Sequence, residues 1–168
     1  VSPTDGWAVG WNGAILHWDG IRWSLDGTAA AEGEALASVS MVASDDGWAV
    51  GWGSTILHWD GASWVKVDSP VADDLTGVTA VSHDDAWAVG VGGVILHWDG
   101  ETWAAVPSPT QQDLNAVDVE AAGGGWAVGQ RGTILHWDGR SWTTAASPVE
   151  ADLAAVAVVS ETDGCIVG

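Results

Sequence analysis

Short apolar runs alternate along the whole chain with turns of Gly, Asp, Ser and Pro. One unit contains the runs Leu75–Ser82, Trp87–Gly90 and Ile95–Trp98, and a fourth that starts at Trp103. Runs this short, rich in Val, Ile and Trp and bounded by turn residues, are typical of β-strands. The best helical candidate, residues 29–37, has no apolar stripe, so we interpret it as a long loop. The pattern therefore predicts an all-β chain built from units of four short strands.

The unit recurs along the sequence with nearly constant spacing. The tetrapeptide WAVG starts at Trp7, Trp48, Trp87 and Trp126, so successive starts are 41, 39 and 39 residues apart. The hexapeptide ILHWDG follows each of them, starting at Ile15, Ile56, Ile95 and Ile134. We divide a single domain of residues 1–168 into repeats 7–47, 48–86, 87–125 and 126–164, with 165–168 starting a fifth. Four antiparallel strands every ~40 residues are typical of a β-propeller blade, so we predict a propeller of about four blades.

The two ends of the chain carry the same segment. VSPTDGWAVG occupies residues 1–10 and VSETDGCIVG occupies residues 159–168, so the chain spans four repeat lengths plus an overlap. The first strand near the C-terminus, Leu153–Ser160, is therefore predicted to complete the N-terminal blade and close a four-blade ring. Two alternatives stay open: the chain is part of a larger ring, or the overlap pairs with a neighbouring chain.

The repeated motif WAVGxxGxILHWDGxxW resembles the repeats of bacterial Trp-rich β-propellers, as found in myxobacterial surface and secreted proteins. Its tail, Asp60–Trp64, is similar to a shortened Asp-box, a structural hairpin of sialidase-like propellers; the first unit departs from that pattern at Arg22. The resemblance implies a propeller fold and an extracellular or cell-surface location. It implies no particular activity, because propellers host unrelated functions.

Composition narrows the possible partners. With 23 acidic and four basic residues, the net charge of −19 argues against nucleic acid and against anionic membrane surfaces. No apolar run is long enough to insert into a membrane. The lone Cys165 excludes an intramolecular disulfide and any zinc site made of cysteines.

The His and Asp of ILHWDG are the most conspicuous candidates for chemistry. They are His17, His58, His97 and His136, with Asp19, Asp60, Asp99 and Asp138. Equivalent histidines in different blades point away from one another, so they cannot bind one shared ion. Within a blade, one His and one Asp are too few ligands for zinc. We therefore predict a structural role for these residues and neither a metal nor a cofactor. The Asp-Gly pairs suit hairpin turns. Glycoside hydrolysis needs two carboxylates ~5–10 Å apart, and a sialidase-type site needs a Tyr nucleophile, which the chain lacks. We therefore predict no enzymatic activity.

The loop between the second and third strands varies most between units. It carries Trp11, Trp52 and the pair Gln130 and Arg131, with Val91 at the equivalent place in the third unit. Exposed indoles on a propeller loop face suit a glycan or an apolar protein surface. Our predicted binding site therefore consists of Trp11, Trp52, Gln130 and Arg131. The alternative for the indoles is that they fill the channel or the blade rims. The alternative function is a structural protein whose copies associate through the overlapping terminal strands.

Overall fold

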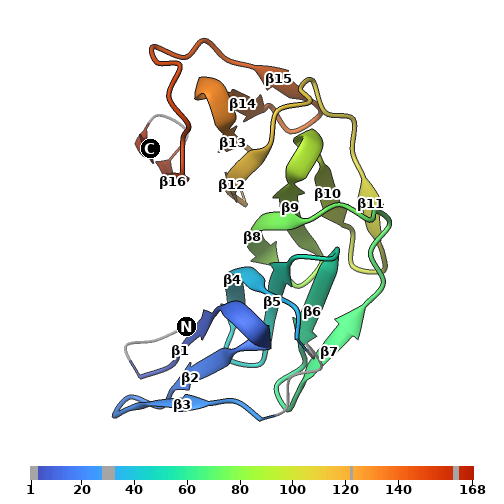
Figure 1. The fold of residues 1–168 in the computed structure, drawn as a ribbon, viewed down its shortest axis with the longest axis vertical. Coiled ribbons are helices and arrows are strands. Elements are labelled where there is room, and N and C mark those ends of the chain that lie inside the picture. Colours follow the sequence, from blue (N-terminus) through green and yellow to red (C-terminus); the bar gives the residue numbers. More distant parts are fainter. Residues whose placement is uncertain (1–3, 28–32, 122, 161–162) are drawn as a thin grey trace.

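The computed structural model describes residues 4–27, 33–121, 123–160 and 163–168. Three complete four-stranded antiparallel sheets stand between a three-stranded sheet and a two-stranded sheet (Figure 1). We number these sheets as blades 1 to 5 along the chain. The observed architecture confirms the predicted all-β class and the four-strand unit.

The strands of the first two blades follow the sequence order. Blade 1 contains β1 (Gly6–Val9), β2 (Ile15–Trp18) and β3 (Trp23–Leu25). Blade 2 contains β4 (Leu36–Ala43), β5 (Asp46–Gly51), β6 (Thr55–Trp59) and β7 (Trp64–Val67). Residues 29–32 of the predicted loop 29–37 lie outside the described residues, and its last two residues, Leu36 and Ala37, belong to β4.

The remaining blades repeat this order. Blade 3 contains β8 (Leu75–Ser82), β9 (Asp85–Gly90), β10 (Ile95–Trp98) and β11 (Trp103–Ala105). Blade 4 contains β12 (Leu114–Val119), β13 (Gly125–Gly129), β14 (Ile134–Trp137) and β15 (Trp142–Thr144). Blade 5 contains β16 (Ala155–Ser160) and β17 (Asp163–Val167). Single 3₁₀ turns, η1 (Trp11–Gly13), η2 (Val91–Gly93) and η3 (Gln130–Gly132), link the second and third strands of three blades.

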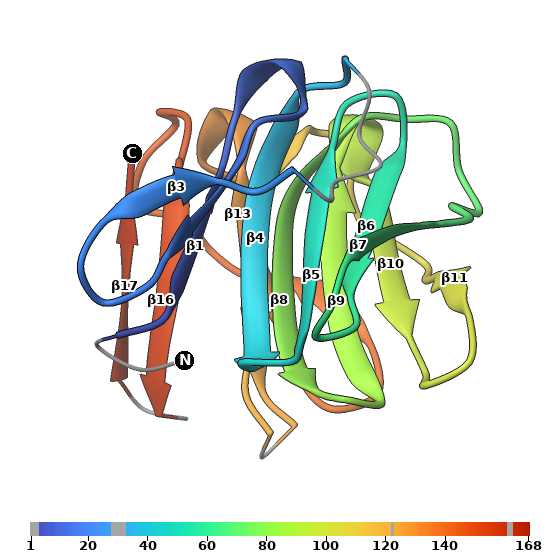
Figure 2. The ribbon, with the colours of Figure 1, turned by 90° about the horizontal axis from the view of Figure 1, so that it is seen from below.

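The blades form an arc that stays open between blade 1 and blade 5 (Figure 1). The first strands β4, β8, β12 and β16 lie on the inner side of the arc, and each contacts the next (Figures 1 and 2). In the described residues β16 pairs with β17, and Ala157 lies opposite Cys165. The predicted closed four-blade ring, in which Leu153–Ser160 completes the N-terminal blade, is therefore wrong for this structure.

A short hairpin explains the open arc. Pairing β16 with β17 closes a loop of a few residues, whereas pairing β16 with β1 would join strands from opposite ends of the chain. The entropic cost of closing a loop rises with its length, so the local hairpin has the lower cost. As a result, β17 occupies the edge of β16 that a closed ring would give to β1.

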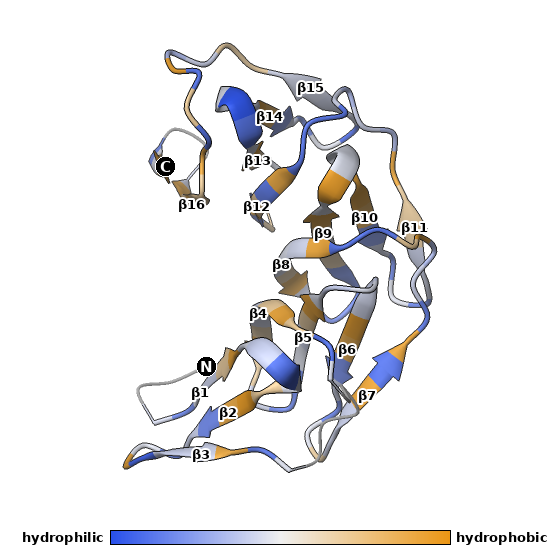
Figure 3. Cartoon of the chain, viewed as in Figure 1, coloured by the Kyte–Doolittle hydropathy of each residue, from blue (hydrophilic) through white to orange (hydrophobic). Residues whose placement is uncertain are grey.

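Buried apolar side chains form a separate core between each pair of neighbouring blades. They come from strands that carry many hydrophobic residues, coloured orange in Figure 3. The core of blades 2 and 3 joins Trp48, Val50 and Ile56 of one blade to Leu96 and Trp103 of the next. Strands in a complete blade bury both faces, which is why ILHW shows no alternation of apolar and polar residues. Burial of this kind makes each blade depend on its neighbours.

The inner strands are also joined by polar contacts. The backbone N–H groups of Val78 and Ala80 in β8 donate to the hydroxyls of Ser38 (3.2 Å) and Ser40 (3.0 Å) in β4. In the same way the N–H of Val158 in β16 donates to Asp118 of β12 at 2.7 Å. These bonds occupy strand edges that would otherwise be free to pair with another chain.

Candidate functional site

The predicted binding residues lie on the tight turns after the second strands. In each 3₁₀ turn the middle residue has a left-handed backbone: φ is 57° at Asn12, 69° at Gly92 and 53° at Arg131. Only Gly adopts this conformation freely, and Asn tolerates it better than most residues, so the turn backbone constrains the sequence at this place. The first residue is exposed in three of the turns, at Trp11, Trp52 and Val91, whereas Gln130 is half-buried.

An aspartate fixes three of these turns to the neighbouring blade. Asp74 accepts a hydrogen bond at 2.8 Å from the N–H of Gly53 in the preceding blade, through Oδ1. Its backbone carbonyl accepts a second bond, from the N–H of Val91 in its own blade. The equivalent carboxylates of Asp113 and Asp152 accept from Gly92 and Arg131 of their preceding blades. We call Asp74, Asp113 and Asp152 the bridging aspartates.

Trp11 and Trp52 lie against each other although they belong to different blades. Their ring centroids are 4.9 Å apart and the ring planes meet at 75°, an edge-to-face contact. Trp11 is 69% exposed and Trp52 is 45% exposed. At this interface Ala35 stands where the other blades have a bridging aspartate, so no carboxylate of that kind fixes the Trp11 turn.

Acidic groups surround the Trp52 turn. A Cβ built on Gly53 would lie 3.1 Å from Oε2 of Glu34, which places that carboxylate directly beside the turn. The carboxylate of Asp74 also lies beside this turn, because it accepts a hydrogen bond from the Gly53 N–H. The exposed indole pair is therefore bordered by oxygen atoms that accept hydrogen bonds.

Gln130 and Arg131 belong to blade 4, and the Val91 turn of blade 3 stands between them and Trp52. The side-chain amide of Gln130 donates to Asp113 Oδ2 at 2.8 Å, so it is held to its own blade. Arg131 is exposed, with its backbone N–H bound to Asp152. The four predicted binding residues thus share one kind of turn, and the only ring contact among them joins Trp11 to Trp52.

The repeated histidines pair with aspartates twelve residues upstream. The Nε2 atoms of His17, His58 and His97 lie 2.8, 2.8 and 2.9 Å from Oδ1 of Asp5, Asp46 and Asp85. The ring of each of the four histidines also packs against the second-strand tryptophan of its blade, with centroids 4.3–4.5 Å apart. The His17 ring is stacked on Trp7, and the other three pairs are tilted. In blade 4 Gly124 replaces the aspartate, so His136 keeps the ring contact alone among the described residues.

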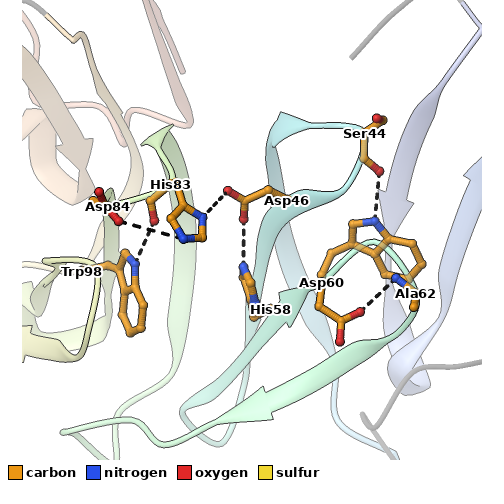
Figure 4. Close-up of polar contacts among 9 residues, drawn as sticks. Ser44, Asp46, His58, Asp60, Ala62, His83, Asp84 and Trp98 are labelled. Carbon is orange, nitrogen blue, oxygen red and sulfur yellow. Dashed lines mark hydrogen bonds and ion pairs between the residues drawn. The ribbon is translucent and has the colours of Figure 1, made fainter.

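One aspartate links two blades. Asp46 binds His58 of its own blade through Oδ1 and His83 of blade 3 through Oδ2, the latter at 3.0 Å (Figure 4). The hydrogen bond to Asp46, together with its charge and that of Asp84, raises the pKa of His83 above 6.5. Ser44 occupies the place of His83 in blade 2, and within the described residues this histidine link joins only blades 2 and 3.

The aspartates of ILHWDG cap the hairpins between the third and fourth strands. Oδ1 of Asp60 accepts from the backbone N–H groups of Ser63 (2.8 Å) and Ala62 (2.9 Å). The same pair of bonds is made by Asp19, Asp99 and Asp138. These bonds lower the pKa of all four carboxyl groups below 3.8. The N–H three residues after each aspartate has the largest effect, and the N–H two residues after it has the next largest.

Two contacts of the site were missed by sequence reasoning. The partner of His17, His58 and His97 is the aspartate two residues before WAVG, and the bridging aspartates precede Leu75, Leu114 and Leu153. Both signals were present, because each aspartate recurs at a fixed place in most units. Among the described residues no three metal-ligating side chains gather, and no helix there is long and apolar enough to cross a membrane.

No protein-family model and no curated protein matches the sequence. Solved structures match the fold. YCF48 bound to D1 peptide and YCF48 from Cyanidioschyzon merolae are each 22% identical, with TM-scores of 0.71, over 92% and 94% of this chain. The structure of U3-55K is 11% identical, with a TM-score of 0.76 over 91% of this chain. The chain spans 54%, 57% and 51% of these three structures, about half their length. The likeness shows that this chain has the β-propeller fold.

Proposed function

We propose that the chain is a non-enzymatic binding module that holds a neutral glycan on Trp11 and Trp52. The observation that carries this proposal is the contact of two exposed indoles from adjacent blades, with ring centroids 4.9 Å apart. Two aromatic faces set at a steep angle can contact two faces of a sugar chain. Glu34 and Asp74 beside the Trp52 turn supply acceptors for sugar hydroxyls.

Charge restricts the class of glycan. The net charge of −19 and the carboxylates beside the indole pair disfavour sialylated, sulfated or uronic-acid chains. Uncharged sugars have no such penalty. An extracellular or cell-surface location, where such chains occur, is part of the proposal.

A glycan array followed by calorimetric titration tests this function. We expect binding of neutral oligosaccharides that weakens at least tenfold in Trp11→Ala and in Trp52→Ala. Val91→Ala is the matched control, because Val91 occupies the equivalent exposed position in blade 3 and should leave affinity unchanged. Equal binding by the unsubstituted chain and the three variants would show that the indole pair does not bind the sugar. Binding of an extended peptide instead of a sugar would keep the module but replace its ligand; one matched structure, YCF48, holds a peptide.

A second candidate function is assembly through the terminal blades. It is favoured by the incomplete sheets at both ends of the arc, three strands in blade 1 and two in blade 5. Sedimentation velocity of the 168-residue chain tests it directly. A particle larger than one copy supports assembly, and a monomer at every concentration contradicts it.

A further inference from the structure

The chain forms the same aromatic interface three times. In each copy a second-strand tryptophan packs on the third- and fourth-strand tryptophans of the next blade. The sets are Trp7 with Trp59 and Trp64, Trp48 with Trp98 and Trp103, and Trp87 with Trp137 and Trp142. Centroid distances are 4.7–4.8 Å to the third-strand ring and 5.0–5.6 Å to the fourth-strand ring. The three interfaces can therefore be compared position by position.

A pocket of about 380 Å³ opens where the outer strands of blades 2 and 3 meet. Both blades have four strands, and the outermost, β7 and β11, lie on the outer side of the arc (Figure 1). Blade 2 lines the pocket with Val67, Asp68 and Pro70, and blade 3 lines it with Trp98, Glu101 and Trp103. We call it the rim pocket. Its volume is within the range of roughly 300–1,000 Å³ that small-ligand sites occupy.

The two tryptophans of the rim pocket are held in place by contacts with the rest of the protein. The Trp98 ring packs on Trp48 with centroids 4.8 Å apart, and its Nε1–H donates to the backbone carbonyl of His83 at 3.1 Å (Figure 4). Trp103 is buried and contacts the same Trp48 edge to face, at 5.0 Å. A ligand that binds on rings already fixed loses less free energy to ordering the site.

Two carboxylates border these rings. Asp68 and Glu101 are both exposed, and neither side chain makes a hydrogen bond or an ion pair with any other residue that the structure describes. Both carboxylates are thus available to a ligand. An aromatic face beside carboxylates attracts a cation, through the ring quadrupole and through charge.

The two acids are special to this interface, whereas the tryptophans are not. Between blades 3 and 4 the equivalent positions hold Pro107 and Arg140, and between blades 1 and 2 they hold Gly27 and Ala62. The third- and fourth-strand tryptophans are present at all three interfaces. A role in the fold that every interface shares therefore explains the tryptophans but not the acids.

We propose that the rim pocket binds an arginine side chain of a partner peptide. The planar guanidinium lies against the indole of Trp98 and pairs with the carboxylates of Asp68 and Glu101. Its apolar stem packs on Val67 and Pro70. Lysine fits less well, because its compact ammonium group is more strongly hydrated and has no planar face to stack.

This site goes beyond the proposed glycan site and does not depend on it. The rim pocket is built from the outer strands, whereas Trp11 and Trp52 lie on the turns after the second strands. Loss of sugar binding in Trp11→Ala should therefore leave arginine binding unchanged. The net charge of −19 attracts basic segments to the whole surface, so the test must separate the pocket from that general attraction.

Titration with the peptide acetyl-Gly-Arg-Gly-amide, followed by the indole N–H signals in nuclear magnetic resonance, tests the proposal. We expect a saturable shift of the Trp98 signal, which is assigned by its loss in Trp98→Phe. The lysine peptide should bind more weakly. The citrulline peptide keeps the shape of arginine without its charge and should give no saturable shift. Equal affinity of the citrulline or lysine peptide would overturn arginine as the occupant.

Substitutions copied from the other blades locate the binding. Glu101→Ala reproduces Ala62 and should weaken arginine binding by roughly threefold, as should Asp68→Ala. Glu101→Arg reproduces Arg140 and should abolish binding. Because other blades carry these residues in the same hairpin, both Glu101 variants should fold. Glu150→Ala is the matched control, since it removes an equal exposed charge outside the pocket and should leave the affinity unchanged.

Two results would overturn the rim pocket as an arginine site. One is an affinity for the arginine peptide that is the same in Glu101→Ala, Asp68→Ala and Glu150→Ala, which would show general attraction to an acidic surface. The other is the absence of any saturable shift with the arginine peptide.

Discussion

Trp23 and Trp64 occupy the same place in the repeat but differ in environment. Each pairs with the third-strand tryptophan of its own blade, at 5.7 Å for Trp18 and 5.6 Å for Trp59. Trp64 is nevertheless 1% exposed and Trp23 is 50% exposed, because blade 1 covers the first and no described blade covers the second. The repeat sequence therefore specifies the hairpin, whereas the preceding blade decides whether its tryptophan is buried.

The largest effect should come from removing the buried member of this pair. We expect Trp64→Ala to lower the free energy of unfolding by about 3–5 kcal/mol, because it leaves a cavity between blades 1 and 2. Trp59→Ala in the neighbouring strand should cost a similar amount. Trp23→Ala should cost about 1 kcal/mol or less in dilute, monomeric protein. Urea unfolding of the three variants checks the comparison, and a loss at Trp23 equal to that at Trp64 would show that blade 1 is covered.

The bridging aspartates allow a second comparison between interfaces. Asp74→Ala removes the acceptor of the Gly53 N–H and should cost about 1 kcal/mol. Ala35→Asp introduces the same carboxylate at the interface that lacks it and should add about 0.5–1 kcal/mol. Both changes are measured by urea unfolding, with Ala35→Leu as a control for side-chain size, because Leu has no hydrogen-bond acceptor. If Ala35→Asp also destabilises, the Trp11 turn is held in a way that differs from the other turns.

Acid should act on every hairpin alike. The folded pKa of Asp60 is lowered by the backbone N–H groups of Ser63 and Ala62, so its contribution to stability is present above pH 3.8. That contribution is lost as the pH falls through the lower folded pKa. Unfolding midpoints between pH 2 and 6 should therefore fall less steeply in Asp60→Asn. Asp68→Asn, an exposed aspartate outside the hairpin caps, should retain the acid dependence of the original chain. A slope unchanged in Asp60→Asn would contradict the capping role.

The smallest effect concerns the one interface that has a histidine link. The pKa of His83 is raised above 6.5, so its contribution is complete below pH 6.5 and disappears as the pH rises through the folded value. His83→Ser, which copies the Ser44 of the preceding blade, should remove this dependence. Melting temperatures at pH 5.5 and pH 9 measure it. If the melting temperature changes by the same amount between pH 5.5 and pH 9 in both proteins, the hydrogen bond between Asp46 and His83 contributes nothing measurable to stability.

Strand positions were predictable because they depend on local sequence. The predicted Leu75–Ser82 is strand β8, and the predicted starts at Trp103 and Ile95 are those of β11 and β10. Turn residues and β-branched runs act within a few positions, so one unit is enough to reveal them. The contacts of the Trp11–Trp52 pair were not predictable, since they depend on the angle between two blades. The open arc was missed for the same reason: the choice between β17 and β1 as the partner of β16 is a competition between a short and a long loop.

The tryptophan clusters also give the protein an optical label. Indoles that lie 4.7–5.6 Å apart in a fixed orientation couple their electronic transitions, which produces paired bands in circular dichroism. Each of the three interfaces among blades 1 to 4 contributes one such cluster, and the chain has neither Phe nor Tyr to overlap with it. The intensity of these bands therefore counts the blade contacts that are intact. Loss of one contact, or gain of another between copies, can be followed in the unmodified chain without a dye.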